Sequence, residues 1–457
     1  MQITKKNLNV KENIVTGSFY AFFNRFNVSS ILTKSNITKV RGVKTKDILL
    51  NISELPFLQK NFYQGIVLNR DLNFTKTTGY EFLKDNRFNW RKFLLELVSL
   101  IIRSFLKPLT NKNNEGVFII DDTSYNRNRS KNVELLANVY DHVTHKYFKG
   151  FRILSLCWSD GHSVLPVDFS LLSSKNPKNR YCKMNTNMDK RSTAYKRKLE
   201  AINKSTDLLV PMIKRAFKHG IKAKYVLMDT WFGMPSIIAS IKPLADVICM
   251  VKNSEKIHYT LEDKKVELKQ IYKQIKKKRG KSQVKGSQIV EIPDEDGKLM
   301  KVKLVFIKNR NKKSDYLAIL STNINLEDDE IVRIYSKRWG IEVFFKMIKS
   351  CLKLTGEVEL RSYEGMVAHI SIVMFRYVFL SVEQRKCVDA KTFGGVFHET
   401  IQEMKDITLI EAINMIIMFV CEKIKKIQEL SREIIEEIIN IMLGAVTEKF
   451  GLKLYRS

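Results

Sequence analysis

Four polar side chains near residue 340 have the spacing of one helix face: Tyr335, Arg338, Glu342 and Lys349. At about 100° per helical residue, they fall within an arc of about 60°. Because a carboxylate can bind a divalent metal ion while neighbouring cations hold phosphate, such a row is suited to phosphodiester chemistry. The alternative is an ordinary amphipathic helix with ion pairs between successive turns.

The same segment carries an apolar stripe beside the polar row, which a helix would bury. Its members are Ile334, Ile341, Phe345, Ile348 and Leu352. The pattern therefore predicts one helix over 335–349, with its polar row at the border of the buried face.

Two short apolar stretches, typical of strands buried on both faces, end in aspartate. Residues 117–120 are followed by Asp121 and Asp122, and residues 225–228 by Asp229. A carboxylate at the end of a buried strand is held on a rigid element, as a metal ligand should be. A single aspartate at such a place often only begins a turn, so each position alone is weak evidence.

Together with Glu342, these aspartates form a set of three acids: Asp122, Asp229 and Glu342. Three carboxylates with no His or Cys partner favour Mg²⁺ or Mn²⁺ over zinc. Two such ions, about 3.5–4 Å apart, would activate an attacking hydroxyl and stabilise a leaving oxygen. Since adjacent strand residues point to opposite faces, only one of Asp121 and Asp122 can face the metals.

The elements that would position these acids form a mixed α/β pattern. Strands are predicted at 117–120, 152–158, 163–172, 225–228 and 247–251, and helices at 195–219 and 235–241. Residues 1–45 are polar and predict a loosely ordered arm. Helical patterns also fill about 46–110 and the segment from about 365 to the end, including 410–426 and 427–442.

The patterns predict a division of the chain into five parts. These are an N-terminal helical region expected to bind DNA (1–110), a first catalytic part (111–253), a β-rich insertion (254–326), a second catalytic part (327–378) and a C-terminal helical region (379–457). The N-terminal helices could equally serve only to pack on the core.

The charge of the chain indicates a polyanionic partner. Lys and Arg number 79 against 48 Asp and Glu, a net charge of +31, and nucleic acid is the first candidate. No apolar run approaches the roughly 20 residues of a membrane span, and the N-terminus does not resemble a secretory signal. The six cysteines are scattered without a C-x-x-C pair, which is typical of reduced thiols in a cytosolic protein.

Two basic segments could bind the DNA backbone. They are 175–198 and 273–281, with Lys252 as a weaker candidate for a phosphate contact. Trp231 and Trp339 lie beside acidic residues and could stack on an unpaired base, but the interpretation favoured for both is packing in the core.

The spacing Tyr-x2-Arg-x3-Glu-x6-Lys and the segments Asp122-Thr-Ser and Asp229-Thr-Trp-Phe resemble the motifs of a DDE transposase from a bacterial insertion sequence. The resemblance covers about 115–375 and implies a ribonuclease-H-like domain with a β-rich insertion. It implies that Asp122, Asp229 and Glu342 bind two Mg²⁺ (or Mn²⁺) ions. It also implies that Tyr335, Arg338 and Lys349 contact DNA phosphates. The family motif places its acid directly before Thr, which selects Asp122 over Asp121.

The resemblance further implies an enzyme that cuts insertion-sequence ends and joins them to target DNA by hydrolysis and transesterification. Its partners would be the terminal inverted repeats, the target DNA and a second copy of the chain, at the bacterial nucleoid in the cytoplasm. Two alternatives stay open. One is a ribonuclease-H-like nuclease such as a resolvase, and the other is an inactive or domesticated DNA-binding protein.

Overall fold

The computed structural model describes residues 17–405 except for seven gaps, and a few isolated positions beyond them. The gaps are 70–71, 111–114, 142–144, 277–282, 295, 310–314 and 387–391, and the isolated positions are 434, 437, 440 and 441. The basic segment predicted at 273–281 lies mostly in a gap. The helices predicted at 410–426 and 427–442 also lie outside the described residues, apart from those isolated positions.

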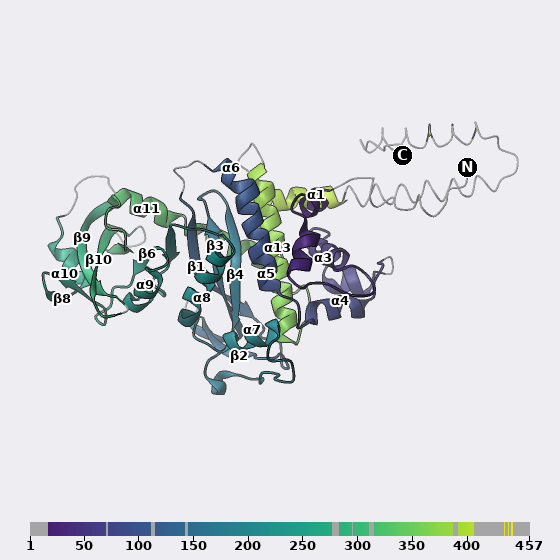
Figure 1. Cartoon of the computed structure of the whole chain (residues 1–457), viewed down its shortest axis with the longest axis horizontal. Helices are drawn as coiled ribbons and strands as arrows, with labels where there is room; N and C mark the ends of the chain where they lie inside the picture. The colour runs from purple at the N-terminus through teal and green to yellow at the C-terminus, as the bar shows by residue number, and fades with distance from the viewer. Residues whose placement is uncertain are drawn as a thin grey trace.

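The centre of the molecule is a sheet built from the first six strands (Figure 1). They are β1 (Val117–Asn126), β2 (Ala137–Asp141), β3 (Lys146–Ser159), β4 (Val164–Leu172), β5 (Tyr225–Met228) and β6 (Asp246–Val251). β3 lies antiparallel between β1 and β4, whereas β5 and β6 continue from β1 in parallel. This mixed order, with helices against the sheet, makes the fold α/β and ribonuclease-H-like, as predicted. The sequence analysis missed β2.

The segment predicted as a β-rich insertion extends this sheet. It contains β7 (His258–Leu261), β8 (Lys264–Glu267), α10 (Leu268–Gln274), β9 (Val284–Pro293), β10 (Leu299–Lys308) and β11 (Tyr316–Ser321). β11 pairs antiparallel with β6, and β10 and β9 follow it outward. The inserted strands gather at the left of Figure 1, on the opposite side of the molecule from the N-terminal helices.

The N-terminal region is helical, as its pattern predicts. Its elements are α1 (Ser18–Arg25), α2 (Val28–Lys34), α3 (Thr45–Glu54), η2 (Tyr63–Val67), α4 (Lys76–Lys84), α5 (Trp90–Ile101), η3 (Ile102–Leu106) and α6 (Lys107–Leu109). The prediction of a loose arm over 1–45 is wrong from Ser18 onward. Phe19 and Phe22 on α1 are fully buried, and the Phe19 ring lies 4.5 Å from that of Phe379 on α13. Aromatic side chains one helical turn apart were the signal for this packing.

A buried ionic network joins the N-terminal helices to the sheet. Arg91 on α5 contacts Asp168 on β4 at 2.8 Å and Glu200 on α7 at 2.5 Å. Arg215 on α8 contacts the same Asp168 at 2.7 Å. The prediction of one helix over 195–219 is wrong, because α7 (Thr193–Ala201) and α8 (Ser205–Lys218) are separated by a short turn.

The longest described helix, α13 (Tyr363–Lys386), runs through the middle of the molecule (Figure 1). It crosses residue 378, where the sequence predicts a boundary. By length and composition it could span a membrane, contrary to the sequence analysis, but its apolar window is entirely buried inside the protein. Arg376 in this helix is fully buried and contacts Glu357 at 2.6 Å, and Glu357 contacts His369 at 2.8 Å. We therefore take α13 as the core helix of the fold.

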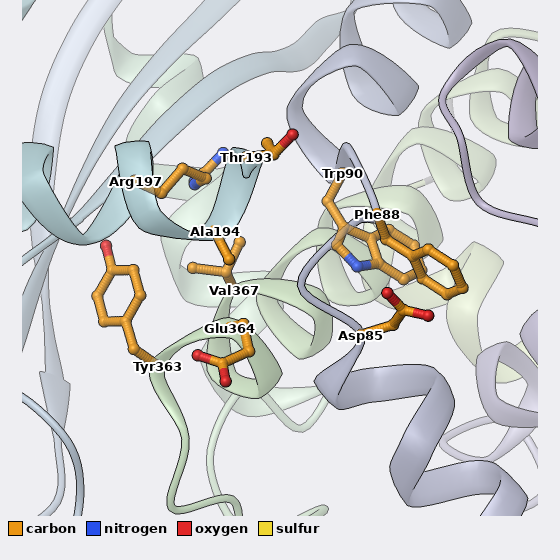
Figure 2. Close-up of a pocket in the computed structure, with 9 residues that line it drawn as sticks. All are labelled: Asp85, Phe88, Trp90, Thr193, Ala194, Arg197, Tyr363, Glu364 and Val367. Carbon is orange, nitrogen blue, oxygen red and sulfur yellow. The ribbon is translucent and has the colours of Figure 1, made fainter. Parts of the chain in front are cut away.

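A small cavity lies where α7, α13 and the N-terminal helices meet (Figure 2). Its volume is about 10 Å³, close to that of one water molecule. Arg197 and Trp90 line it, and both side chains are almost completely buried. The cavity has room for about one water molecule and is too small for an organic ligand.

Candidate active site

The predicted polar row lies on two helices instead of one. α11 (Asp328–Ser336) carries Tyr335, and α12 (Trp339–Ser350) carries Glu342 and Lys349. At the junction, the N–H of Arg338 donates to the carbonyl of Tyr335 at 3.0 Å, and such bonds across three residues tighten the turn. The prediction of one regular helix is therefore wrong at this junction. The apolar stripe is buried as predicted.

Two carboxylates meet where β1 and β5 run side by side. Ile119 pairs with Leu227 and Ile120 with Met228 in parallel register. The next residues along the two strands are Asp121 and Asp229, so their side chains leave the sheet at one level and on one face. The backbone N–H groups of Trp231 and Phe232 donate to Asp229 at 3.0 and 3.4 Å.

Arg338 links this pair to the third acid. Its guanidinium contacts the carboxylate of Asp121 at 3.0 Å and that of Glu342 at 3.3 Å. Burial acts to lower the pKa of Arg338, but Tyr335 and the charges of Asp121, Glu342 and Asp229 together raise it. Arg338, at the start of α12, therefore lies among the three acidic side chains Asp121, Asp229 and Glu342.

Asp122, the first acid selected from the sequence, has a different partner. Its carboxylate is held by the guanidinium of Arg152 on β3, with one hydrogen bond of 2.9 Å and a second, shorter one. The same guanidinium donates to the carbonyl of Tyr140 at 2.9 Å. Asp122 is still near enough to Asp229 to raise the pKa of that carboxyl. Asp121 thus contacts Arg338 and Asp122 contacts Arg152, and the choice of Asp122 as the first acid stays a prediction.

The pairing of strands explains why Asp121, and not Asp122, lies on the face of Asp229. The sequence of one strand shows that its side chains alternate between two faces. It does not show on which of these faces the acid of a neighbouring strand lies. Arg152 was missed because nothing in its strand marks it as the partner of an acid 30 residues earlier.

Burial and a neighbouring negative charge raise the pKa of Asp121. Desolvation, followed by the charge of Asp229, raises the pKa of Asp121 from 3.8 to about 7, against the lowering effect of Arg338. Burial also raises the pKa of Asp229, and the hydrogen bonds from Trp231 and Phe232 oppose it. Closely placed carboxylates with raised pKa values are typical of functional sites.

The remaining predicted DNA contacts differ in exposure. Tyr335 is only 9% exposed, and its hydroxyl donates to the carbonyl of Met228 at 3.3 Å, so it holds the end of β5. Lys349 is exposed and donates to the hydroxyl of Ser124 at 3.3 Å. Lys252 is exposed directly after β6, at the same edge of the sheet as Asp229. Of these three side chains, the two lysines are exposed and Tyr335 is buried.

The two tryptophans beside the acids are exposed, so the interpretation that both pack in the core is wrong. Trp231 is 53% exposed and Trp339 is 68% exposed. Their glycine neighbours fix the backbone nearby. A Cβ on Gly233 would lie 2.4 Å from the carbonyl oxygen of Met250, and one on Gly340 would lie 2.4 Å from Val164. Both glycines therefore allow close packing that places large rings outward at the site.

The acids can be tested against the metal that they imply. No group of three or more His, Cys, Asp or Glu side chains in the described part of the chain already has the arrangement of a metal site. Arg338 contacts both Asp121 and Glu342 in this arrangement. Asp121 and Asp229 fit a divalent cation, since two crowded carboxylates gain from a shared positive charge and offer the oxygen ligands that Mg²⁺ prefers.

The raised pKa of Asp121 predicts how the stability of the metal-free protein depends on pH. The folded state retains the Asp121 proton up to about pH 7, whereas the unfolded chain releases it near 3.8. The contribution of Asp121 to stability is therefore lost as the pH rises from about 4 to about 7. Asp121→Asn, which cannot ionise, should gain up to about 4 kcal/mol relative to wild type between pH 4 and 8.

Urea denaturation of both proteins with a chelator present, at several pH values, would measure this difference. A difference between the two proteins that stays constant with pH would show that Asp121 ionises normally.

Comparison with protein families agrees with this geometry. Residues 61–258 match the family model described as "DDE superfamily endonuclease", and residues 190–383 match the one described as "Archaeal putative transposase ISC1217". The two matches overlap, and together they include Asp121, Asp229 and Glu342. No curated protein matches the chain. Together the two matches support a DDE transposase of an insertion sequence, a nuclease-type enzyme that acts on DNA.

Proposed function

We propose that this transposase cuts DNA at the ends of an insertion sequence and joins those ends to target DNA, and that it needs divalent metal ions. The observation that carries the proposal is the meeting of Asp121 and Asp229 on adjacent parallel strands, beside the Arg338–Glu342 pair. Hydrolysis at an end and attack by the freed 3′-hydroxyl are the same phosphoryl-transfer chemistry, so one site can perform both.

Asp121, Asp229 and Glu342 would hold the Mg²⁺ or Mn²⁺ ions. When bound, such ions polarise the scissile phosphate, lower the pKa of the attacking hydroxyl and offset charge on the leaving oxygen. Asp122 is the alternative first acid, on the strength of the family motif.

The other side chains would orient the substrate and the acids. Arg338 would hold Glu342 in place before DNA binds and then turn to a phosphate, since a guanidinium binds both anions well. Lys349 and Lys252 would contact phosphates on either side of the acids. Tyr335 would act indirectly, because it is buried and holds the backbone that ends in Asp229.

The wider biology follows from the same proposal. The DNA would carry terminal inverted repeats, and two copies of the chain would hold the two ends together. The N-terminal helices over 1–110 would add DNA contacts, and the enzyme would work at the nucleoid in the cytoplasm of a bacterium.

Cleavage of a labelled duplex that carries the element's own end tests this function. With Mg²⁺, wild type should nick the 3′ end of the element, and Glu342→Gln should lose about 10³-fold in rate while binding the duplex. Lys346→Gln, a change at an exposed position on the same helix, is the matched control and should cut normally. Binding without cleavage by wild type, with Mn²⁺ also tried, would contradict the enzymatic proposal.

A further inference from the structure

A basic groove lies beyond the acids, at the far ends of the elements that carry them. Its volume is about 650 Å³, and its two walls are the loops 126–133 and 355–361. The first wall continues from β1, which carries Asp121, and the second continues from the end of α12, which carries Glu342. The groove is therefore connected to the acids by two rigid elements.

The charge of the groove is strongly positive. Its lining includes four cations, Arg127, Arg129, Lys131 and Arg361, and a single acid, Glu359. Arg129, Lys131 and Arg361 are exposed, and within the described part of the chain their side chains have no ion-pair partner. Exposed cations that converge without acidic partners are suited to binding a row of phosphates.

The groove is held in shape by contacts in its walls. The N–H of Arg127 donates to the carbonyl of Lys149 at 2.7 Å, which fixes the first wall to β3. The N–H of Glu134 donates to the carbonyl of Arg361 at 2.9 Å, which joins the two walls at their base. The guanidinium of Arg127 lies against the ring of Tyr125, and its buried Nε has no hydrogen-bond partner. The backbone of both walls and the side chain of Arg127 are therefore held in place before any ligand binds.

We propose that this groove binds the phosphate backbone of duplex DNA several base pairs away from the phosphate that is cut. The inference rests on the proposed function and extends it to a second DNA contact. From Asp121 to Asn126 the strand rises by about 16 Å. One strand of a duplex carries one charge per 3.4 Å of its axis, so this distance corresponds to about five base pairs.

The test compares two triple variants that remove the same charge. Arg129→Gln/Lys131→Gln/Arg361→Gln changes the groove. Lys214→Gln/Lys218→Gln/Lys222→Gln changes three exposed lysines on and just after α8, outside every segment proposed to contact DNA. Binding of a fluorescein-labelled mixed-sequence duplex is measured by anisotropy over a series of KCl concentrations.

The groove variant should lower the slope of log K against log [KCl] by about 2 to 3, at about 0.9 for each lost phosphate contact. The control variant should lower it by less than about 1. Glu359→Gln, which removes the acid of the groove, should strengthen binding. This second variant keeps the test decisive if the triple variant does not fold.

Cleavage assays distinguish a defect in the groove from a defect in the active site. On a duplex cut back to fewer than about five base pairs on either side of the cleaved phosphate, the groove variant should cut as well as wild type. On long DNA, it should need a higher DNA concentration.

The proposal that the groove binds DNA would be overturned if the salt-dependence slope fell equally in both triple variants. It would also be overturned if the slope did not fall in the groove variant. Failure of wild type to bind or cut DNA would instead overturn the proposed function, so the two failures can be distinguished.

Discussion

Asp121→Asn is expected to lower the rate of DNA cleavage by about 10³-fold or more, whereas Asp122→Asn should cost less than about tenfold. The physical reason is the difference between their partners. Asp121 lies in register with Asp229 and contacts Arg338, but the charge of Asp122 is already balanced by Arg152. Single-turnover cleavage of the element's end in Mg²⁺ measures both rates directly.

The two variants are matched in chemistry, since each replaces a carboxylate by an amide at adjacent positions of one strand. Arg152→Gln is the third member of the set, and it should affect the rate about as much as Asp122→Asn. The reverse ranking, with Asp122→Asn the more damaging change, would support the choice that the Asp-Thr-Ser motif indicates. It would also mean that the role of Asp121 is limited to holding the guanidinium of Arg338 in place.

Arg376→Met is expected to destabilise the protein by about 3–5 kcal/mol, because it leaves the carboxylate of Glu357 buried without its cation. Both side chains are completely buried, and Arg376 also donates to the carbonyls of Ile52 and Ser53 on α3. Burial alone would raise the pKa of Glu357, but Arg376 and His369 hold it below its usual value. Urea denaturation at neutral pH measures the loss.

Arg333→Met is the matched control, because Arg333 also pairs with a glutamate, Glu330, but is 45% exposed in its side chain. An exposed pair of this kind contributes less than about 1 kcal/mol. The double variant Arg376→Met/Glu357→Gln should recover part of the stability lost by Arg376→Met alone, since no charge is left buried. Equal losses for Arg376→Met and Arg333→Met would mean that the buried pair is not a special support of the core.

The site residues were predictable to the extent that local pattern defines them. The apolar runs before Asp121 and Asp229 and the spacing of Arg338 and Glu342 identify three elements, because burial selects hydrophobic residues at strand and helix periods. The face of β1 that joins Asp229 depends on pairing between strands far apart in the sequence, and this cannot be read from one strand. The exposure of Trp231 and Trp339 was missed for a similar reason, since large rings are usually buried.

For the fold, too, features set by local sequence were predictable and features set by pairing between distant strands were not. The mixed sheet was predictable from its strands, but its extension was not. β11 belongs to the core sheet because it pairs with β6, and nothing in its own sequence distinguishes it from the inserted strands. The helix junction at Arg338 was also missed, because the polar row and the apolar stripe keep the helical period on both sides of it.

The pairing of β11 with β6 has a geometric consequence for how a rod-shaped substrate can lie. Adjacent strands of a sheet rotate by roughly 20–25° with a constant hand. From β5 through β6, β11 and β10 to β9 there are four such steps, which add to about 80–100°. The sheet that begins beside Asp229 thus turns through about a right angle by β9. The outer inserted strands therefore run roughly across the direction of β5, so a straight rod cannot lie along both.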